Sequence, residues 1–550
     1  MREPAAPGAG GPAAPAAQAD EPLQHALPEE QDAAPHPGYY NPAPVSPTPA
    51  RLIIQPGTDA DGTPRLNARV EVQEGGASSL SSVATLCNSA VGAGVLSLPF
   101  AFRCAGLAGG LLLCLLVAVA ESFSLYVLSK FAERYDAPSY GSLVRRALGR
   151  KTASSLSAIM LLYLVGSCIA YLVIIGDTFS ALAQQAFGIG AYTDRQPILL
   201  GVGLLVILPM CFARSLAALE WVSAGAVAGF LYTSAAVLLR GSQVVAARTN
   251  PWAGILLWQP DLRQALYSVS ILVFGFNSSA NAISIFSELD SYPHRLVVLL
   301  PPSPMQYASL RPLAPRPRTH KLIGMLGVIL VAMTLIAAGY IVVGAAGYAA
   351  FPGTVSSNLL NTFPQDDAVM QVARAVIGLM VTGHYPLAFV PARVAFADLL
   401  HSLFDVERPP HWMEVAFTLV FVGGSLGTAL VITDLGSVLH LIGGTAACFM
   451  VFLLPGLLCW NGAVIKATAS TLNLDALAEG EEGGSDGLAS ADGAGAGPSA
   501  PLLYAKKAGL RTHGVLFVSE SRMWWAGLGL LVLAGLVFVI TLVTAGGGAE

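Results

Sequence analysis

Two apolar stretches of the sequence contain residues that interrupt a helix where no water could replace the lost hydrogen bonds. In the first stretch, Asn88 precedes Gly92, Ala93 and Gly94, and Pro99 follows soon after. An interrupted helix frees N–H groups that can hold a carboxylate and carbonyl groups that can hold a cation. The alternative is that these small residues serve only close packing between helices.

The second stretch places amides and hydroxyls in the middle of an apolar segment. Its sequence is Phe276, Asn277, Ser278 and Ser279, followed by Asn281. Asparagine side chains in hydrocarbon are costly unless they find polar partners. We expect the two stretches to face each other as the two halves of one solute site.

A few isolated polar groups lie in other apolar segments. His384 titrates near neutral pH, so it is either a proton-coupling group or a neutral histidine bonded to a neighbouring helix. Glu121 is either a proton carrier or a hydrogen-bonded packing residue. We expect Asp434 to cap a helix and Arg374 to extend its guanidinium towards the membrane surface.

These residues stand in a chain whose composition is that of a membrane protein. Of the 550 residues, 54% are hydrophobic and 11% are charged, whereas soluble domains carry about 25% charge. The mean hydropathy is +0.62. This composition disfavours a cytosolic enzyme, a nucleic-acid binder and a disulfide scaffold. The seven cysteines have no CxxC spacing, so they are interpreted as small buried thiols, and no metal site is predicted.

Apolar runs long enough to cross a bilayer predict an all-α polytopic protein with about eleven transmembrane helices. They lie near 83–102, 107–131, 155–181, 197–213, 216–239, 265–287, 322–351, 369–392, 412–433, 435–460 and 523–545. With the N-terminus in the cytosol, 23 Lys and Arg fall on the inner side and five on the outer side. The positive-inside rule therefore predicts a cytosolic N-terminus.

The predicted spans divide the chain into four parts. Residues 1–80 are rich in proline and alanine and are expected to form a disordered cytosolic tail, followed by a ten-helix core over 81–465. Residues 466–520 are expected to form a disordered Gly/Ala/acidic loop, and 521–550 hold the last helix. The segment 296–318 combines six prolines with basic residues, which indicates an insertion or a retained intron in the gene sequence.

The motifs of these spans resemble those of the amino acid/auxin permease family, which includes sodium-coupled neutral and vacuolar amino acid transporters. The resemblance covers roughly residues 80–465 and the last span. It rests on Asn88-Ser-Ala-Val-Gly-Ala-Gly-Val-Leu-Ser-Leu-Pro-Phe-Ala, Glu121-Ser-Phe-Ser-Leu-Tyr126, Gly166-Ser-Cys-Ile-Ala-Tyr171, Ile285-Phe-Ser-Glu288-Leu, Gly347-Tyr-Ala-Ala-Phe351, Pro391-Ala-Arg393 and Pro455-Gly-Leu457. It implies a LeuT-type fold of two inverted five-helix repeats plus one C-terminal helix.

The resemblance also implies a function and a site. Gly92, Ala93 and Gly94 would meet the carboxylate of a neutral amino acid, and the segment from Phe276 to Ser279 would meet its amino group. Asn88 and Thr382 match the region of the sodium site, although His384 stands near the place of a second threonine.

We expect a monomeric secondary-active symporter, not an enzyme, in the plasma membrane or a vacuolar or lysosomal membrane. Co-transported Na⁺ or H⁺ would take the place of a cofactor, and the amino acid and the lipid bilayer would be the only partners, with no nucleic acid. The alternative is a membrane amino-acid sensor of the same fold that signals through its N-terminal tail.

Overall fold

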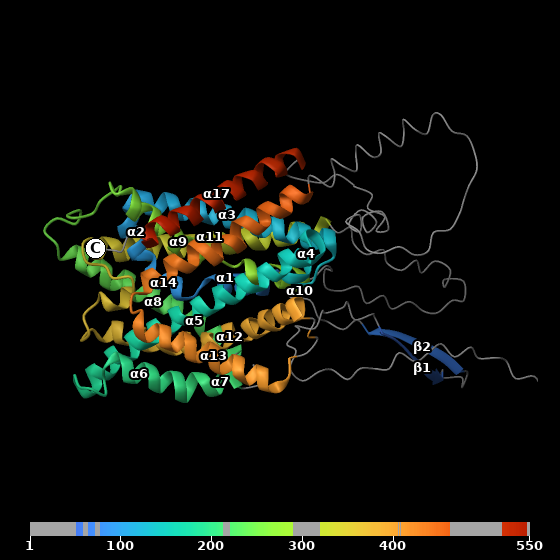
Figure 1. The fold of residues 1–550 in the computed structure, drawn as a ribbon, viewed down its shortest axis with the longest axis horizontal. Coiled ribbons are helices and arrows are strands. Elements are labelled where there is room, and N and C mark those ends of the chain that lie inside the picture. Colours follow the sequence, from blue (N-terminus) through green and yellow to red (C-terminus); the bar gives the residue numbers. More distant parts are fainter. Residues whose placement is uncertain are drawn as a thin grey trace, which may run out of the picture. The chain divides into compact units, whose positions relative to one another are not determined.

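The computed structural model describes residues 51–58, 64–71, 78–212, 220–289, 319–404, 406, 409–462 and 520–546. Nearly all of them lie in long helices packed side by side (Figure 1). The first half of the chain forms α1 (Ser79–Ala90), η1 (Ala93–Ser97), α2 (Leu98–Ala105), α3 (Leu107–Tyr135), α4 (Tyr140–Leu148), α5 (Arg150–Phe187), α6 (Arg195–Val202), η2 (Gly203–Ile207), α7 (Leu208–Phe212) and α8 (Glu220–Ala246). The second half forms α9 (Leu262–Phe276), α10 (Ser279–Glu288), α11 (Thr319–Ala350), η4 (Leu359–Asn361), α12 (Ala368–Phe404), α13 (His411–Val431), α14 (Leu435–Ile442), η5 (Gly443–Ala447), η6 (Phe449–Leu453) and α17 (Glu520–Gly546).

The prediction of a polytopic helical membrane protein is confirmed. Among the described residues, nine helices are long and apolar enough to cross a membrane, and the bent pair Ser79–Ala90 and Ala93–Ala105 raises the number to ten. Helix α8 includes residues 220–239 of the remaining predicted span, 216–239. The count of about eleven spans and the inverted five-helix repeat stay predictions.

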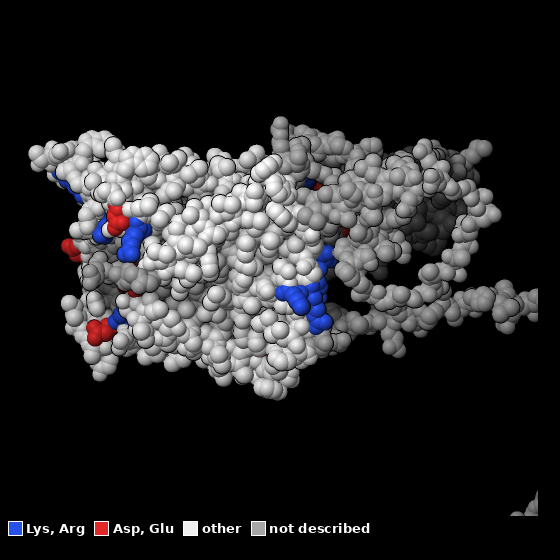
Figure 2. All heavy atoms as spheres, turned by 45° about the horizontal axis from the view of Figure 1, so that its top comes forward, with Lys and Arg blue, Asp and Glu red and all other residues white. Residues whose placement is uncertain are grey.

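The charges on the surface fit this arrangement. Figure 2 shows a broad band without Lys, Arg, Asp or Glu between the two ends of the helix bundle. On the visible face, one end carries a group of Lys and Arg, while the other carries charges of both signs. A belt free of charge is what a hydrocarbon environment requires of a protein surface.

Two helical spans are interrupted, and they touch at the interruption. The first bends by 54° between α1 and the η1–α2 segment, and the sixth changes from α9 to α10 at Asn277 and Ser278. A Cβ atom added to Gly94 would lie 2.8 Å from the Cα atom of Gly275. This close approach explains why glycine stands at position 94, since any side chain would push the two backbones apart.

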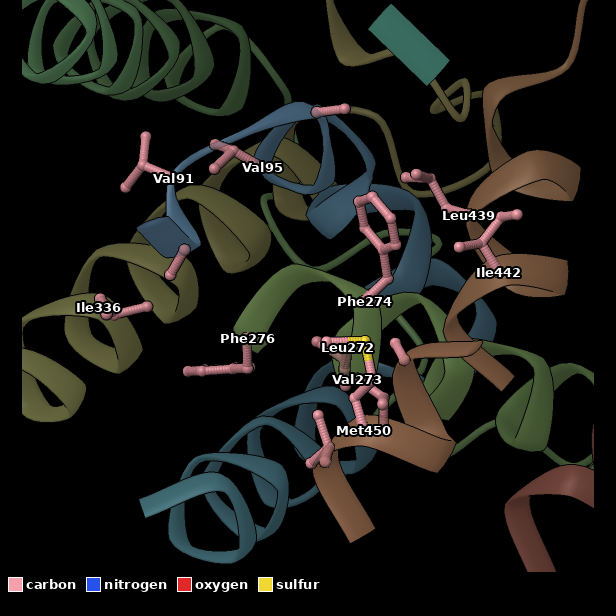
Figure 3. Close-up of a cluster of buried hydrophobic side chains, with 14 of the residues drawn as sticks. Val91, Val95, Leu272, Val273, Phe274, Phe276, Ile336, Leu439, Ile442 and Met450 are labelled. Carbon is pink, nitrogen blue, oxygen red and sulfur yellow. The ribbon is translucent and has the colours of Figure 1, made fainter. Parts of the chain in front are cut away.

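A cluster of buried apolar side chains surrounds the meeting point (Figure 3). Val91 and Val95 come from the first span, Phe274 from α9, and Leu439 and Ile442 from α14, and all are buried. Helix α9 also packs against α2, α3, α14 and η5. The sixth span therefore lies in the middle of the bundle, where its interruption cannot reach lipid.

The N-terminal tail contains one pair of strands among its described residues. β1 (Arg51–Thr58) and β2 (Pro64–Glu71) are antiparallel, and Arg51 pairs with Glu71. The division of the chain into a disordered tail over 1–80, a helical core, a disordered loop over 466–520 and a last helix stays a prediction. Most of the tail, most of the loop 466–520 and the segment 296–318 lie outside the described residues.

The contact between Gly94 and Gly275 yields a stability prediction. We expect Gly94→Ala to lower the free energy of unfolding by about 1–3 kcal/mol, because a methyl group there overlaps backbone atoms. Thermal unfolding in detergent should show a lower Tm for Gly94→Ala. The matched control is Gly423→Ala in α13, where an added Cβ meets open space. Equal Tm values for the two variants would contradict the proposed close packing.

Candidate functional site

The first interruption follows directly from the local sequence. Helix α1 ends at Ala90, where the N–H of Val91 donates to the carbonyl of Cys87 at 3.0 Å. Gly92 then adopts an extended conformation with φ −148° and ψ −149°, and η1 begins at Ala93. A new helical segment has no preceding turn to accept its first N–H groups, so the predicted anion-binding groups lie at such a helix start.

The second interruption is stabilised by its own side chains. The Ser278 hydroxyl donates to the carbonyl of Phe276 at 3.0 Å, and the N–H of Ser279 donates to Oδ1 of Asn277 at 3.2 Å. The Asn277 side chain also lies near the Tyr163 hydroxyl of α5. The side chains of Asn277 and Ser278 would be costly in an intact apolar helix, but here they form hydrogen bonds with backbone groups that lack a helical partner.

A single tyrosine joins the two interruptions. The hydroxyl of Tyr340 in α11 lies 2.8 Å from the carbonyl oxygen of Ala90 and 2.9 Å from that of Gly275. Tyr340 is fully buried, and its ring packs edge-on against Phe276 with 4.9 Å between ring centroids. The predicted pairing of the two polar stretches is thus physically present, and α11 contributes the connecting group.

Glu121 of α3 contacts the second interruption as well. Its Oε1 atom accepts hydrogen bonds from the N–H of Ser278 at 3.0 Å and from the hydroxyl of Ser279 at 3.1 Å. Its Oε2 atom is buried and has no hydrogen-bond partner among the described residues. The expectation that Glu121 is hydrogen-bonded is confirmed, and its partners are the residues of the break itself.

The residues of the predicted ion site are only loosely associated. Oδ1 of Asn88 is buried without a hydrogen-bond partner among the described residues. The Thr382 hydroxyl donates to the carbonyl of Gly378 at 2.7 Å within α12, which leaves its oxygen lone pairs available. The neighbouring Ser89 hydroxyl accepts from the side-chain amide of Asn281 at 2.7 Å, so α1 and α10 are linked beside Asn88.

His384 is not bonded to a neighbouring helix, although one of its two interpretations expected such a bond. Nδ1 of the buried ring lies 2.9 Å from the carbonyl oxygen of Met380, which belongs to the same helix and not to a neighbouring one. The ring centroid is 6.1 Å from that of Tyr171. A Cβ atom added to Gly92 would lie 3.5 Å from the Tyr171 hydroxyl. Tyr171 therefore lies close to both the His384 ring and Gly92.

A small cavity lies beside the first interruption. It has a volume of about 10 Å³. Its lining residues are Val91, Gly92, Ala93, Val95 and Leu96 of the first span, Phe230 and Thr233 of α8, and Ile377, Met380 and Val381 of α12. A space of this size holds one water molecule and not an amino acid. The described conformation is therefore closed around the candidate site.

Arg374 corrects a further prediction. Its side chain does not reach towards water, because the residue is only 2% exposed. Its guanidinium donates instead to the carbonyls of Leu360, Phe363 and Pro364 at 2.8–3.2 Å. The loop before α12 folds back over the helix and offers these acceptors, so burial replaces snorkelling.

Asp434 confirms its predicted role as a helix cap. Its carboxylate accepts from the N–H of Ser437 at 2.7 Å at the start of α14 and from the hydroxyl of Ser357 at 2.5 Å. Burial alone would raise the pKa of Asp434, but these hydrogen bonds lower it below its ordinary value. The carboxylate thus ties the loop before α12 to α14.

Sequence reasoning missed the groups that complete the site from other helices. Tyr340 and Phe230 lie in apolar spans with ordinary spacing, so no local pattern distinguishes them from packing residues. Tyr171 ends one of the motifs that carry the resemblance, but the motif assigned it no role. The one available signal was general: carbonyl groups that lose their helical partner need another hydrogen-bond donor, so a buried hydroxyl such as that of Tyr340 had to lie nearby.

The bridge made by Tyr340 can be tested directly. We expect Tyr340→Phe to lower the free energy of unfolding by about 1–3 kcal/mol, because two buried carbonyls lose their shared donor. The matched control is Tyr232→Phe, since the Tyr232 hydroxyl donates to Val369 from an exposed position. Thermal unfolding of both variants in detergent provides the measurement. An unchanged Tm for Tyr340→Phe would show that the bridge contributes nothing to stability.

Comparison with known proteins places this arrangement in a family. The chain is 26% identical over 430 residues to sodium-coupled neutral amino acid transporter 7 of Danio rerio, covering 74% of this chain and 83% of the relative. The human protein of that name is 27% identical over 423 residues, covering 74% and 84%. Vacuolar amino acid transporter 2 of Saccharomyces cerevisiae is 24% identical over 386 residues, covering 67% and 73%.

The family model described as "Transmembrane amino acid transporter protein" matches residues 75–300 and 316–468. The gap in this match falls inside the segment 296–318, where the sequence indicates an insertion. The match includes both interrupted spans and every candidate site residue. The chain therefore belongs to the transmembrane amino acid transporter protein family.

Proposed function

We propose that the protein is a secondary-active symporter that couples the movement of a neutral amino acid to that of a cation, Na⁺ or H⁺, by alternating access. One observation carries the proposal: two interrupted helices meet inside the bundle, where Tyr340 holds the carbonyls of Ala90 and Gly275 together. Helix interruptions inside a membrane persist where protein or a water-filled cavity meets the freed backbone groups.

The two ends of an amino acid fit the two interruptions. The helix start at Gly92–Gly94 favours the carboxylate, because N–H groups and the helix dipole favour negative charge there by about 1–2 kcal/mol. The ammonium group would meet the carbonyl of Phe276 and the polar side chains of Asn277, Ser278 and Ser279. The cavity walls are largely apolar, which supports a neutral side chain on the substrate.

The coupled cation has candidate ligands on the first span and on α12. Asn88 offers a buried amide oxygen without a partner, and Thr382 offers a hydroxyl oxygen. His384 is a titratable group in the same part of α12. One cation that moves down a potential of 100 mV supplies about 2.3 kcal/mol, which supports roughly 50-fold accumulation of a neutral solute.

The remaining parts of the proposal concern the setting of the protein. The distribution of Lys and Arg in the sequence supports a cytosolic N-terminus. We propose a monomer without a cofactor, which acts in the plasma membrane or in a vacuolar or lysosomal membrane. Its partners would be the amino acid and the bilayer, with no nucleic acid and no enzymatic activity.

Uptake by proteoliposomes tests the transport function. We expect the purified full-length chain to accumulate radiolabelled neutral amino acids when an inward Na⁺ or H⁺ gradient is imposed, and to stop when the gradient is collapsed by an ionophore. Protein-free liposomes provide the background. Amino acid binding without any accumulation would contradict transport and favour the sensor alternative.

The role of Asn88 is tested by its removal. We expect Asn88→Ala to reduce cation-driven uptake at least tenfold, because an interaction of about 1.4 kcal/mol with the cation corresponds to a factor of ten. Asn250→Ala, in an exposed loop, is the control and should transport like the wild type. Uptake kinetics and cation dependence unchanged in Asn88→Ala would exclude the ion-site assignment.

A further inference from the structure

Glu121 has a hydrogen-bonding pattern that a purely structural carboxylate does not need. The residue is 0% exposed, in the middle of α3. Both donors, from Ser278 and Ser279, bond to Oε1, while Oε2 is buried without a partner among the described residues. Oε1 therefore anchors the break of the sixth span, while Oε2 can still take up a proton.

The surroundings of Glu121 offer no compensating positive charge. Within the described part of the chain, no Lys, Arg or His forms an ion pair with it. The titratable groups that face it are the phenols of Tyr140 on α4 and Tyr163 on α5. The Tyr140 hydroxyl donates its hydrogen to the carbonyl of Met450 at 2.9 Å and not to the carboxylate.

These surroundings select a proton as the ligand of this carboxyl group. An ionised carboxylate in a low-dielectric interior without a counter-charge costs several kcal/mol, and protonation removes that cost. A metal ion would need several further oxygen ligands. Among the described residues, no group of three or more His, Cys, Asp and Glu side chains that could hold a metal ion is present.

We propose that Glu121 is the proton-binding group of the transport cycle and that its protonation state controls how firmly the break of the sixth span is held. This inference rests on the proposed cation-coupled symport. It takes H⁺, bound at Glu121, as the coupled cation in place of Na⁺ at the candidate site of Asn88 and Thr382. The carboxylate takes up one proton from water on the side to which the site is open and becomes a carboxylic acid. It releases the same proton to the opposite side after the change of access.

The hydrogen bonds to Oε1 provide the coupling to the substrate. Bonds to an ionised carboxylate are roughly twice as strong as bonds to a neutral acid. Protonation therefore loosens the anchoring of Ser278 and Ser279, which belong to the segment proposed to meet the substrate ammonium group. Because proton and substrate act on the same break, each changes the affinity for the other by the same factor.

His384 is less well placed for this role. Its Nδ1 atom is hydrogen-bonded to the carbonyl of Met380 within α12. It makes no hydrogen bond to either break among the described residues. A proton on His384 would therefore change neither of the contacts that hold the interrupted helices.

Proteoliposomes that contain the full-length chain can separate proton coupling from transport itself. Counterflow measures the exchange of radiolabelled neutral amino acid for unlabelled amino acid inside the vesicles, without an ion gradient. Proton-driven transport is measured separately under an imposed pH difference, from the accumulation of the radiolabel and from the signal of an entrapped pH dye. For one proton per substrate, a difference of one pH unit supports accumulation of up to about tenfold in the wild type. We expect Glu121→Gln to keep counterflow within about threefold, because glutamine retains an acceptor oxygen, yet to lose accumulation and dye response completely.

Two variants serve as controls. Glu414→Gln makes the same change on a partly exposed side chain of α13 and should keep proton-driven accumulation. Ser279→Ala removes a donor to Glu121 without removing a titratable group, so we expect slower transport that remains proton-driven.

The possible outcomes distinguish the inference from the function on which it rests. Proton-driven accumulation retained by Glu121→Gln would overturn the inference alone, and so would a wild type driven only by Na⁺. If a folded Glu121→Gln variant lost counterflow, Glu121 would have a merely structural role, and the inference would be overturned. If that variant does not fold, Glu121→Asp should remain proton-driven with a shifted pH profile, and an unshifted profile would contradict the assignment. A wild type without counterflow would overturn the transport function, and the inference with it.

Discussion

The structure depends on one constraint, namely that backbone groups freed inside an apolar bundle must find partners within the protein. Interruption of the first and sixth spans creates several such groups at one depth. Tyr340 meets two freed carbonyls, and Glu121 meets the N–H of Ser278. The breaks are therefore held from α11 on one side and from α3 on another, and neither interrupted helix is stable in this form without its neighbours.

The same constraint decides which features could be predicted from sequence. The breaks themselves are local, because Gly92, Gly94 and the Asn277-Ser278 pair leave an apolar helix little alternative. The partners are not local: Tyr340 stands 65 residues from Gly275, and Glu121 stands 157 residues from Ser278. Nothing in the spacing of an ordinary tyrosine in an apolar helix identifies which carbonyl it meets.

Two other residues illustrate how tertiary context overrides a reasonable expectation. Arg374 lies near a predicted membrane surface, yet the loop before α12 supplies three carbonyls and removes the need to reach water. His384 finds its acceptor one turn back in its own helix. By contrast, Asp434 was predictable as a cap because its main partner, Ser437, lies only three residues away.

The small cavity beside Val91–Leu96 has a consequence for selectivity. Since it has a volume of only about 10 Å³, a solute bound at the proposed site would first have to separate the first span from α8 and α12. An affinity measured for that solute would then contain the free energy of the separation, and the apparent Kd would rise as the open form became rarer. Discrimination by size would therefore arise from the work of opening and not from the shape of a ready-made pocket. Two solutes that make identical polar contacts would be ranked by the amount of helix displacement that each one requires.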